Sequence, residues 1–221
     1  MAVAFDNFNS TDNAAAISQP FSTAFTIAAN AYAFLGIRSS VDTNNVSSVI
    51  DNQGGAWNFV SFNDNNGTGT NLIVYKCLNC PGGSTTITVT LSTSVTMRAV
   101  VASYTGVGSD EGLINGTVNG ANMATITSGN IITSGSNEWI VGIVSTNTQT
   151  NGITPNSGET SRGSVALGRM EIQDKLETTS GTYTMSWAFS SATNNNSDSY
   201  ACIALKPSSG SVLPLMGQIC L

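Results

Sequence analysis

The segment NLIVYKCLNCPGGSTTITVTLSTSVTMRAVVASYTGV, residues 71–107, contains three strand patterns and the turns that join them. In TTITVTL, three large apolar side chains alternate with threonines, which is typical of a strand with one buried face and one face in water. Residues 97–104 are almost continuously apolar, which favours burial on both faces. Residues 77–83 combine a proline with two glycines, so the chain can reverse there. The segment therefore predicts consecutive strands of a β-sandwich.

The same kinds of pattern recur along the whole chain. GTYTMSWAF, residues 181–189, alternates cleanly, and EWIVGIV, residues 138–144, is a strong apolar strand. Residues 165–176 fit either a helix or a strand, and their period-two alternation favours a strand. We expect about a dozen short strands in an all-β sandwich. The segments expected between strands include a turn at residues 9–13, an acidic loop at 108–112 and a long surface excursion at 145–163.

The composition is polar but nearly uncharged. Only 9% of the 221 residues are charged, so Ser, Thr, Asn and Gly must supply the polar surface, as in adhesins, secreted modules and virion proteins. The net charge of −6 and the scattered basic residues argue against nucleic-acid binding. No run approaches the roughly 20 apolar residues of a membrane span. The N-terminus lacks the pattern of a signal peptide, so a chain native from Met1 is expected to stay in the cytoplasm where it is made.

Several blocks of the sequence occur in the order of a known module. These blocks are AVAFDN, AYAFLGI, VSSVIDNQGGAWNFV, NLIVYKCLNCPGGSTTITVTL, AVVASYTGV, GTYTMSWAFSS and YACIALKPSSG. Together they resemble an uncharacterised jelly-roll module of bacterial secreted proteins and bacteriophage virion proteins, over about residues 3–206. The CLNCP corner and the C-terminal tail depart from the shared pattern. The resemblance implies an antiparallel, jelly-roll-like β-sandwich and brings no catalytic residues with it.

The last fifteen residues differ from the rest of the chain. Residues 207–211 have linker composition, and the following VLPLMGQICL has no charged side chain. We expect one jelly-roll domain over residues 1–206 and a linker with an apolar tail over residues 207–221. The tail is either a last strand of its own domain or a segment that docks on a neighbouring subunit. In the second interpretation the docking side chains are Val212, Leu213, Leu215, Met216, Ile219 and Leu221.

The four cysteines leave several interpretations open. Cys77 and Cys80 form one CxxC pair, whereas Cys202 and Cys220 are not spaced like a second pair. A local disulfide between Cys77 and Cys80 would clip the hairpin corner in an oxidising compartment. A zinc site built from all four cysteines is an alternative. We expect Cys202, inside YACIALK, to be a small buried core residue.

The sequence offers no evident catalytic centre. The absence of histidine excludes Ser-His-Asp and Cys-His catalysis and every metal site that uses histidine. A glycosidase would need two convergent carboxylates, and no pair stands out in the sequence. An EF-hand pattern fails near residues 62–67, although another calcium site in the acidic loops stays open. We therefore predict no catalytic residue, no cofactor and no metal site. The carboxylates considered are Asp110, Glu111, Glu138, Glu171 and Asp174.

These features together favour a structural virion protein of a bacteriophage, either a capsid decoration or another surface appendage. Its partners would be other virion proteins, with the major capsid protein as a candidate, and neither nucleic acid nor a membrane. By analogy with jelly-roll appendages we expect a homo-oligomer, with a trimer favoured. Its location would be the virion, after synthesis in the host cytoplasm. The alternatives are an extracellular carbohydrate-binding or adhesion module of a secreted bacterial protein and, less favoured, a glycan-degrading enzyme.

Overall fold

The computed structural model describes residues 1–21, 23–64, 71–118, 123–146, 152–165, 169–193 and 198–209, and these residues form strands and no helix. All the strand pairings are antiparallel. The predicted all-β, antiparallel sandwich is thus confirmed. No helix in this described part of the chain could cross a membrane.

The described residues form eighteen strands, more than the dozen expected, because several are only three residues long. The N-terminal half contains β1 (Ala4–Pro20), β2 (Phe25–Ile27), β3 (Ala31–Ser39), β4 (Val46–Asp51), β5 (Trp57–Asp64), β6 (Asn71–Cys80), β7 (Gly83–Thr85) and β8 (Ile87–Thr105). The C-terminal half contains β9 (Val107–Val118), β10 (Met123–Thr127), β11 (Ile131–Thr133), β12 (Glu138–Thr146), β13 (Ile153–Pro155), β14 (Thr160–Val165), β15 (Met170–Glu177), β16 (Gly181–Tyr183), β17 (Ser186–Thr193) and β18 (Asp198–Pro207).

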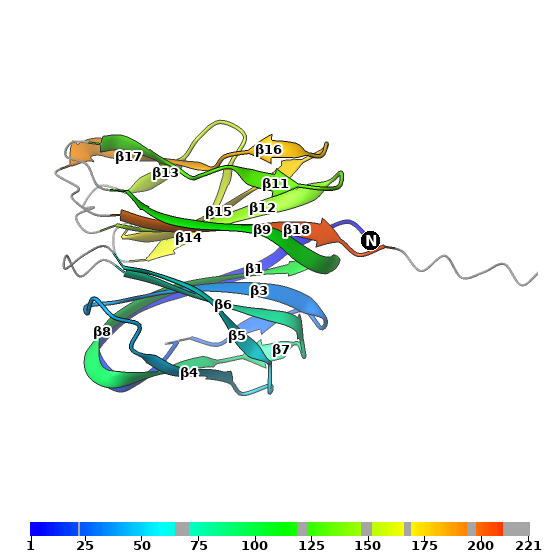
Figure 1. Ribbon diagram of the computed structural model, residues 1–221. Helices are drawn as coiled ribbons and strands as arrows, with labels where there is room; N and C mark the ends of the chain where they lie inside the picture. The colour runs from blue at the N-terminus through cyan, green and yellow to red at the C-terminus, as the bar shows by residue number, and fades with distance from the viewer. Residues whose placement is uncertain are drawn as a thin grey trace, which may run out of the picture.

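Two central sheets face each other in the middle of the molecule (Figure 1). The N-terminal central sheet has the order β1-β8-β3-β6-β5, and the C-terminal central sheet has the order β9-β18-β12-β15-β14. Each is covered on its outer side by a layer of further strands. These are β4, β2 and β7 below one sheet, and β10, β17, β13, β11 and β16 above the other. The result is four layers with three apolar cores between them.

The alternation in the sequence decides which core each side chain enters. Ile87, Val89 and Leu91 on β8 point into the outer core of the N-terminal half. Farther along the same strand, Val100 and Tyr104 point into the central core between the two sheets. The continuous apolar patterns of β8, β12 and β18 follow from this arrangement, because both faces of these strands are covered.

Two expected connections are strands instead, and a third, whose residues 147–151 lie outside the described ones, is partly so. Residues 9–13 lie inside β1, and the side-chain amide of Asn9 donates to the Thr23 carbonyl at 2.7 Å. Residues 108–112 begin β9, and the stretch 145–163 contains β13 and the start of β14. The sequence analysis took the polar residues of these segments as turn formers. They lie in strands instead, where their side chains face water or form hydrogen bonds. The strand expected at residues 165–176 is confirmed from Met170 onward by β15, whereas Val165 ends β14, which pairs with β15 in the antiparallel direction.

The two halves repeat one topology. In an eight-stranded jelly roll, the first strand pairs with the last, the second with the seventh and the third with the sixth. The N-terminal half has the pairs β1–β8, β2–β7 and β3–β6. The C-terminal half has the same pairs, with β9 and β10 in the place of β1 and with β17 and β18 in the place of β8. The jelly roll expected once in this chain therefore occurs twice.

Local details repeat as well. Phe21 N donates to Ile87 O at 2.9 Å, and Ser128 N donates to Met185 O, at the matching place, at 2.8 Å. The edge strand of each central sheet has a register shift at the same point, which falls at Val60 in β5 and at Arg162 in β14. These matches fix which residue of one half corresponds to which residue of the other.

The halves pack against each other reciprocally, as two copies related by a two-fold axis would. β6 packs on β18 and its counterpart β15 packs on β8, while β5 packs on β9 and its counterpart β14 packs on β1. Gly36 and Ile143 occupy matching positions on β3 and β12. They also meet, since a Cβ on Gly36 would lie 2.8 Å from Cγ2 of Ile143. The approximate axis therefore passes close to this pair.

We predict that Gly36→Ala destabilises the protein, because its new methyl group would overlap Ile143 in a close-packed core. Overpacking of this kind costs about 1–3 kcal/mol. Urea unfolding of the two single variants and of the double variant Gly36→Ala with Ile143→Ala measures the coupling between the positions. The double variant should lose less stability than the two single variants together. Additive losses would contradict the contact.

Candidate binding site

The CxxC pair lies at the end of β6 in the outer core of the N-terminal half. Both thiols are buried and unlinked, and Cys80 Sγ donates to the Cys77 carbonyl at 3.5 Å. A separate side-chain hydrogen bond between the two thiols, together with burial, raises the pKa of Cys80, and this thiol–thiol bond lowers the pKa of Cys77. Cys80 therefore holds its proton, and a disulfide between the two stays a prediction. Cys202 is fully buried, as expected.

The predicted docking tail, residues 212–221, and Cys220 lie outside the described residues. Its role therefore stays a prediction. In the part of the chain that the structure does describe, no three His, Cys, Asp or Glu side chains gather as metal ligands would.

The structure does bring two carboxyl groups together. Burial raises the pKa of Glu138, and a hydrogen bond with Glu111 raises it further. Burial alone would raise the pKa of Glu111 too, but bonds from Ser134, Glu138 and Lys206 lower it. Glu138 Oε2 would be an unpartnered buried atom if both groups were ionised, so a proton on Glu138 that is donated to Glu111 accounts for the contact. Because Glu138 is fully buried, this pair is closed to a polysaccharide.

Two further carboxylates lie on β15 and are buried between layers. Burial raises the pKa of Glu171 to about 7, with Ser161 opposing and Glu159 adding to the shift. Burial also raises the pKa of Asp174, although hydrogen bonds from Arg162 and Tyr104 oppose it. These bonds measure 2.6 Å and 2.9 Å, so Asp174 joins the two halves across the central core. The two groups therefore belong to the interior of the fold.

An open hollow lies where the two central sheets meet at one edge. Its volume is about 210 Å³. Strands β5 and β6 contribute residues from the N-terminal half, and β9 and β18 contribute residues from the C-terminal half. The lining residues are Val60, Lys76, Asp110, Glu111, Gly112, Leu113 and Ile203.

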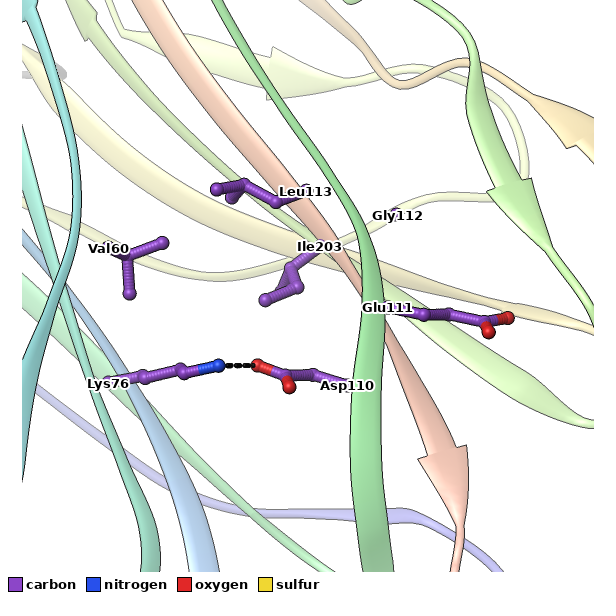
Figure 2. A pocket seen from close by; sticks show the side chains of 7 residues that line it. All are labelled: Val60, Lys76, Asp110, Glu111, Gly112, Leu113 and Ile203. Atoms are coloured by element: carbon purple, nitrogen blue, oxygen red, sulfur yellow. Dashed lines mark hydrogen bonds and ion pairs between the residues drawn. The ribbon is translucent and has the colours of Figure 1, made fainter.

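Figure 2 shows three aliphatic side chains, Val60, Leu113 and Ile203, converging on one side of this hollow. Lys76 and Asp110 point toward each other on the other side, with Nζ and Oδ2 2.6 Å apart. Tyr32 Oη also donates to Asp110 Oδ2, at 2.8 Å. The hollow thus offers an apolar wall and a fixed ion pair, which suits a small group that is mostly apolar. Glu111 points away from it.

The sequence analysis did not identify this hollow. Asp110 and Glu111 were expected in a solvated loop, and Lys76 is one cation inside an apolar strand. The lining residues come from four strands spread over more than half of the chain, so no sequence motif could have joined them. Comparison with protein-family models, with curated proteins and with solved structures finds no match for this chain.

We predict that the protein is more stable at pH 5 than at pH 8, and that Glu171 causes part of the difference. Its pKa rises from 4.5 in the unfolded chain to about 7 in the folded chain. Its stabilising effect is therefore complete below about pH 4.5 and is lost as the pH rises through 7. One pKa unit corresponds to about 1.4 kcal/mol, so this loss is at most about 3 kcal/mol.

Urea unfolding at a series of pH values checks this prediction. Glu171→Gln, which is neutral at every pH, should reduce the fall in unfolding free energy between pH 5 and pH 8. Asp64→Asn, at an exposed position, serves as the matched control and should leave that fall unchanged. An identical pH profile in Glu171→Gln and the unaltered protein would contradict the assignment.

Proposed function

We propose that this protein is a structural component of a bacteriophage virion, a capsid decoration or surface appendage that acts through protein–protein contacts. The observation that carries the proposal is the jelly-roll topology, present twice in one chain. Jelly rolls are frequent in viral capsid proteins and also in lectins. A fold by itself does not define a function, so the other supports come from the surface and the cores.

The doubled topology supports a mechanical role. Three apolar cores lie within a chain of 221 residues, and strands of both halves share the central one. Because each central sheet is covered on both faces, water contacts only the outer layers and the sheet edges. A body of this kind resists local opening, as a shell component must. The nearly uncharged, polar composition supports display in a crowded assembly without strong electrostatic attraction to unrelated partners.

The resemblance to the jelly-roll module of phage virion proteins points in the same direction. In this proposal the displayed body is the double jelly roll, and residues 212–221 attach it to a neighbouring subunit or to another virion protein. Burial of apolar surface, at about 25 cal/mol per Å², is the interaction through which this apolar tail would hold its partner. The proposed oligomer is a trimer, and the proposed location is the virion.

We predict that the protein co-purifies with phage particles in many copies per particle. Antibodies raised against the recombinant chain should label intact particles in electron micrographs, and mass spectrometry of density-banded particles should give its copy number. Detection only in the soluble fraction of the lysate would overturn the proposal. Saturable binding to one class of glycan on an array, together with absence from particles, would favour the carbohydrate-binding alternative instead.

The role of the tail is tested separately. Size-exclusion chromatography with light scattering compares the full chain with a chain that ends at Ser208. We predict an oligomer for the full chain and a monomer for the shortened chain. Two identical monomers would refute the self-association role of residues 212–221, and two identical oligomers would assign the contact to the double jelly roll.

A further inference from the structure

The duplicated fold provides a comparison for the hollow at the edge of the central core. By strand register, Val60 corresponds to Arg162, since each lies at the register shift of its edge strand. On the neighbouring strand, Lys76 corresponds to Asp174. The same position therefore exists at the opposite edge of the interface, with different side chains.

On the third strand of each edge the correspondence is also clear. Asp110 pairs with Leu205 in the C-terminal half. Leu205 corresponds to Tyr104 in the N-terminal half, and Tyr104 pairs with Phe5, so Asp110 corresponds to Phe5. Leu113 lies in the irregular stretch of β9 opposite Ile203. At the matching place in the N-terminal half, Phe8 lies opposite Ala102, so Leu113 corresponds to Phe8. Two aromatic rings in one position thus correspond to a carboxylate and a leucine in the other.

At the position around Arg162 the chain's own side chains fill the space. The Arg162 guanidinium lies over the ring of Phe5, 4.3 Å from its centroid, and over Trp139 at 5.4 Å. Its Nε is 2.6 Å from Asp174 Oδ2. The ring of Phe8 covers Gly163 so closely that a Cβ there would overlap it. This position combines a cation, a carboxylate that neutralises it, and an aromatic ring against the cation.

At the hollow the cation and the carboxylate are present without the ring. Lys76 and Asp110 are 2.6 Å apart, the same separation as in the filled position. Valine, aspartate and leucine are each smaller than the arginine and the two phenylalanines to which they correspond, and the hollow of about 210 Å³ lies here. The lysine side chain is 32% exposed, so its ammonium is accessible to a ring from outside.

We propose that the hollow binds one aromatic side chain of a partner protein, with the ring packed on Val60, Leu113 and Ile203 and its face toward Lys76. The charges are complementary, because the face of an aromatic ring is negative and attracts an ammonium group. The pairing of Arg162 with Asp174 while it stacks on Phe5 indicates that an ion pair and ring stacking are compatible at this position. Buried aromatic anchors are also the commonest energetic centres of protein interfaces.

The size and lining of the hollow disfavour other occupants. Pockets for drug-sized ligands usually measure about 300–1,000 Å³, which is larger than this one. An arginine side chain from a partner would bring a second cation beside Lys76. A sugar would need several hydrogen-bonding groups, whereas three lining side chains are aliphatic and the charged pair is already satisfied. Only the identity of the partner, another virion protein, rests on the proposed function.

The test is an NMR titration of the full, ¹⁵N-labelled chain with N-acetyl-tyrosinamide. We expect saturable shifts of the amides of Val60, Lys76, Leu113 and Ile203, with a dissociation constant on the order of 1 mM for a probe of this size. N-acetyl-leucinamide and N-acetyl-argininamide should bind at least several-fold more weakly. Equal affinity for either control, or shifts centred elsewhere, would overturn the proposal.

Two variants make the test specific to the hollow. Leu113→Phe, which copies Phe8 of the filled position, should place a ring in the hollow and abolish the shifts while the protein stays folded. Ile132→Phe adds the same ring at an exposed strand position and should leave binding unchanged. Unaltered binding by Leu113→Phe would contradict the site. This titration needs no virion, so its failure and the failure of the particle experiment are separate results.

Discussion

The face-to-face burial of the two central sheets is the constraint on which the rest of the structure depends. Each sheet has one face in the outer core of its own half and the other face in the shared central core. Neither sheet would be covered on both faces without the other half. The contact is mostly apolar, and a Tyr104–Asp174–Arg162 cluster crosses it. The Arg162–Asp174 ion pair lies within the C-terminal half, and the bond from Tyr104 to the buried Asp174 crosses between the halves and links their registers.

The sequence predicted the features that depend on period and on burial. TTITVTL and GTYTMSWAF, which both alternate, occupy matching places in the two halves. The apolar side chains of each segment lie in the outer core of its own half. The continuous apolar patterns of residues 97–104 and 138–144 come from strands covered on both faces. These signals survive because a buried face tolerates few polar side chains. They were sufficient for the fold class.

The duplication was not visible in the sequence, because matching positions carry different chemistry. Ile73 and Tyr75 in the outer core of the N-terminal half correspond to Glu171 and Gln173 in the other half. Those polar side chains find partners inside the fold, as when Gln173 donates to Glu159 Oε2 at 2.8 Å. Alternation in a short polar strand, such as β13 or β14, is also too weak to distinguish from a surface loop. The repeat is detected from the pairing of strands that lie far apart in the chain. Sequence patterns do not encode this pairing.

The candidate site could not be predicted for a related reason. Its side chains come from positions that are separately unremarkable, and only the packing of the halves brings Val60 near Leu113. Duplication also gives the hollow a counterpart in which the chain's own side chains fill the matching space. Both positions join the halves: the filled one through Phe5 stacked on Arg162 and Tyr104 bonded to Asp174, and the open one through the Lys76–Asp110 ion pair. Two copies of one interface can therefore diverge, with one filled by rings of the chain itself and the other, in our proposal, open to a ring of a partner.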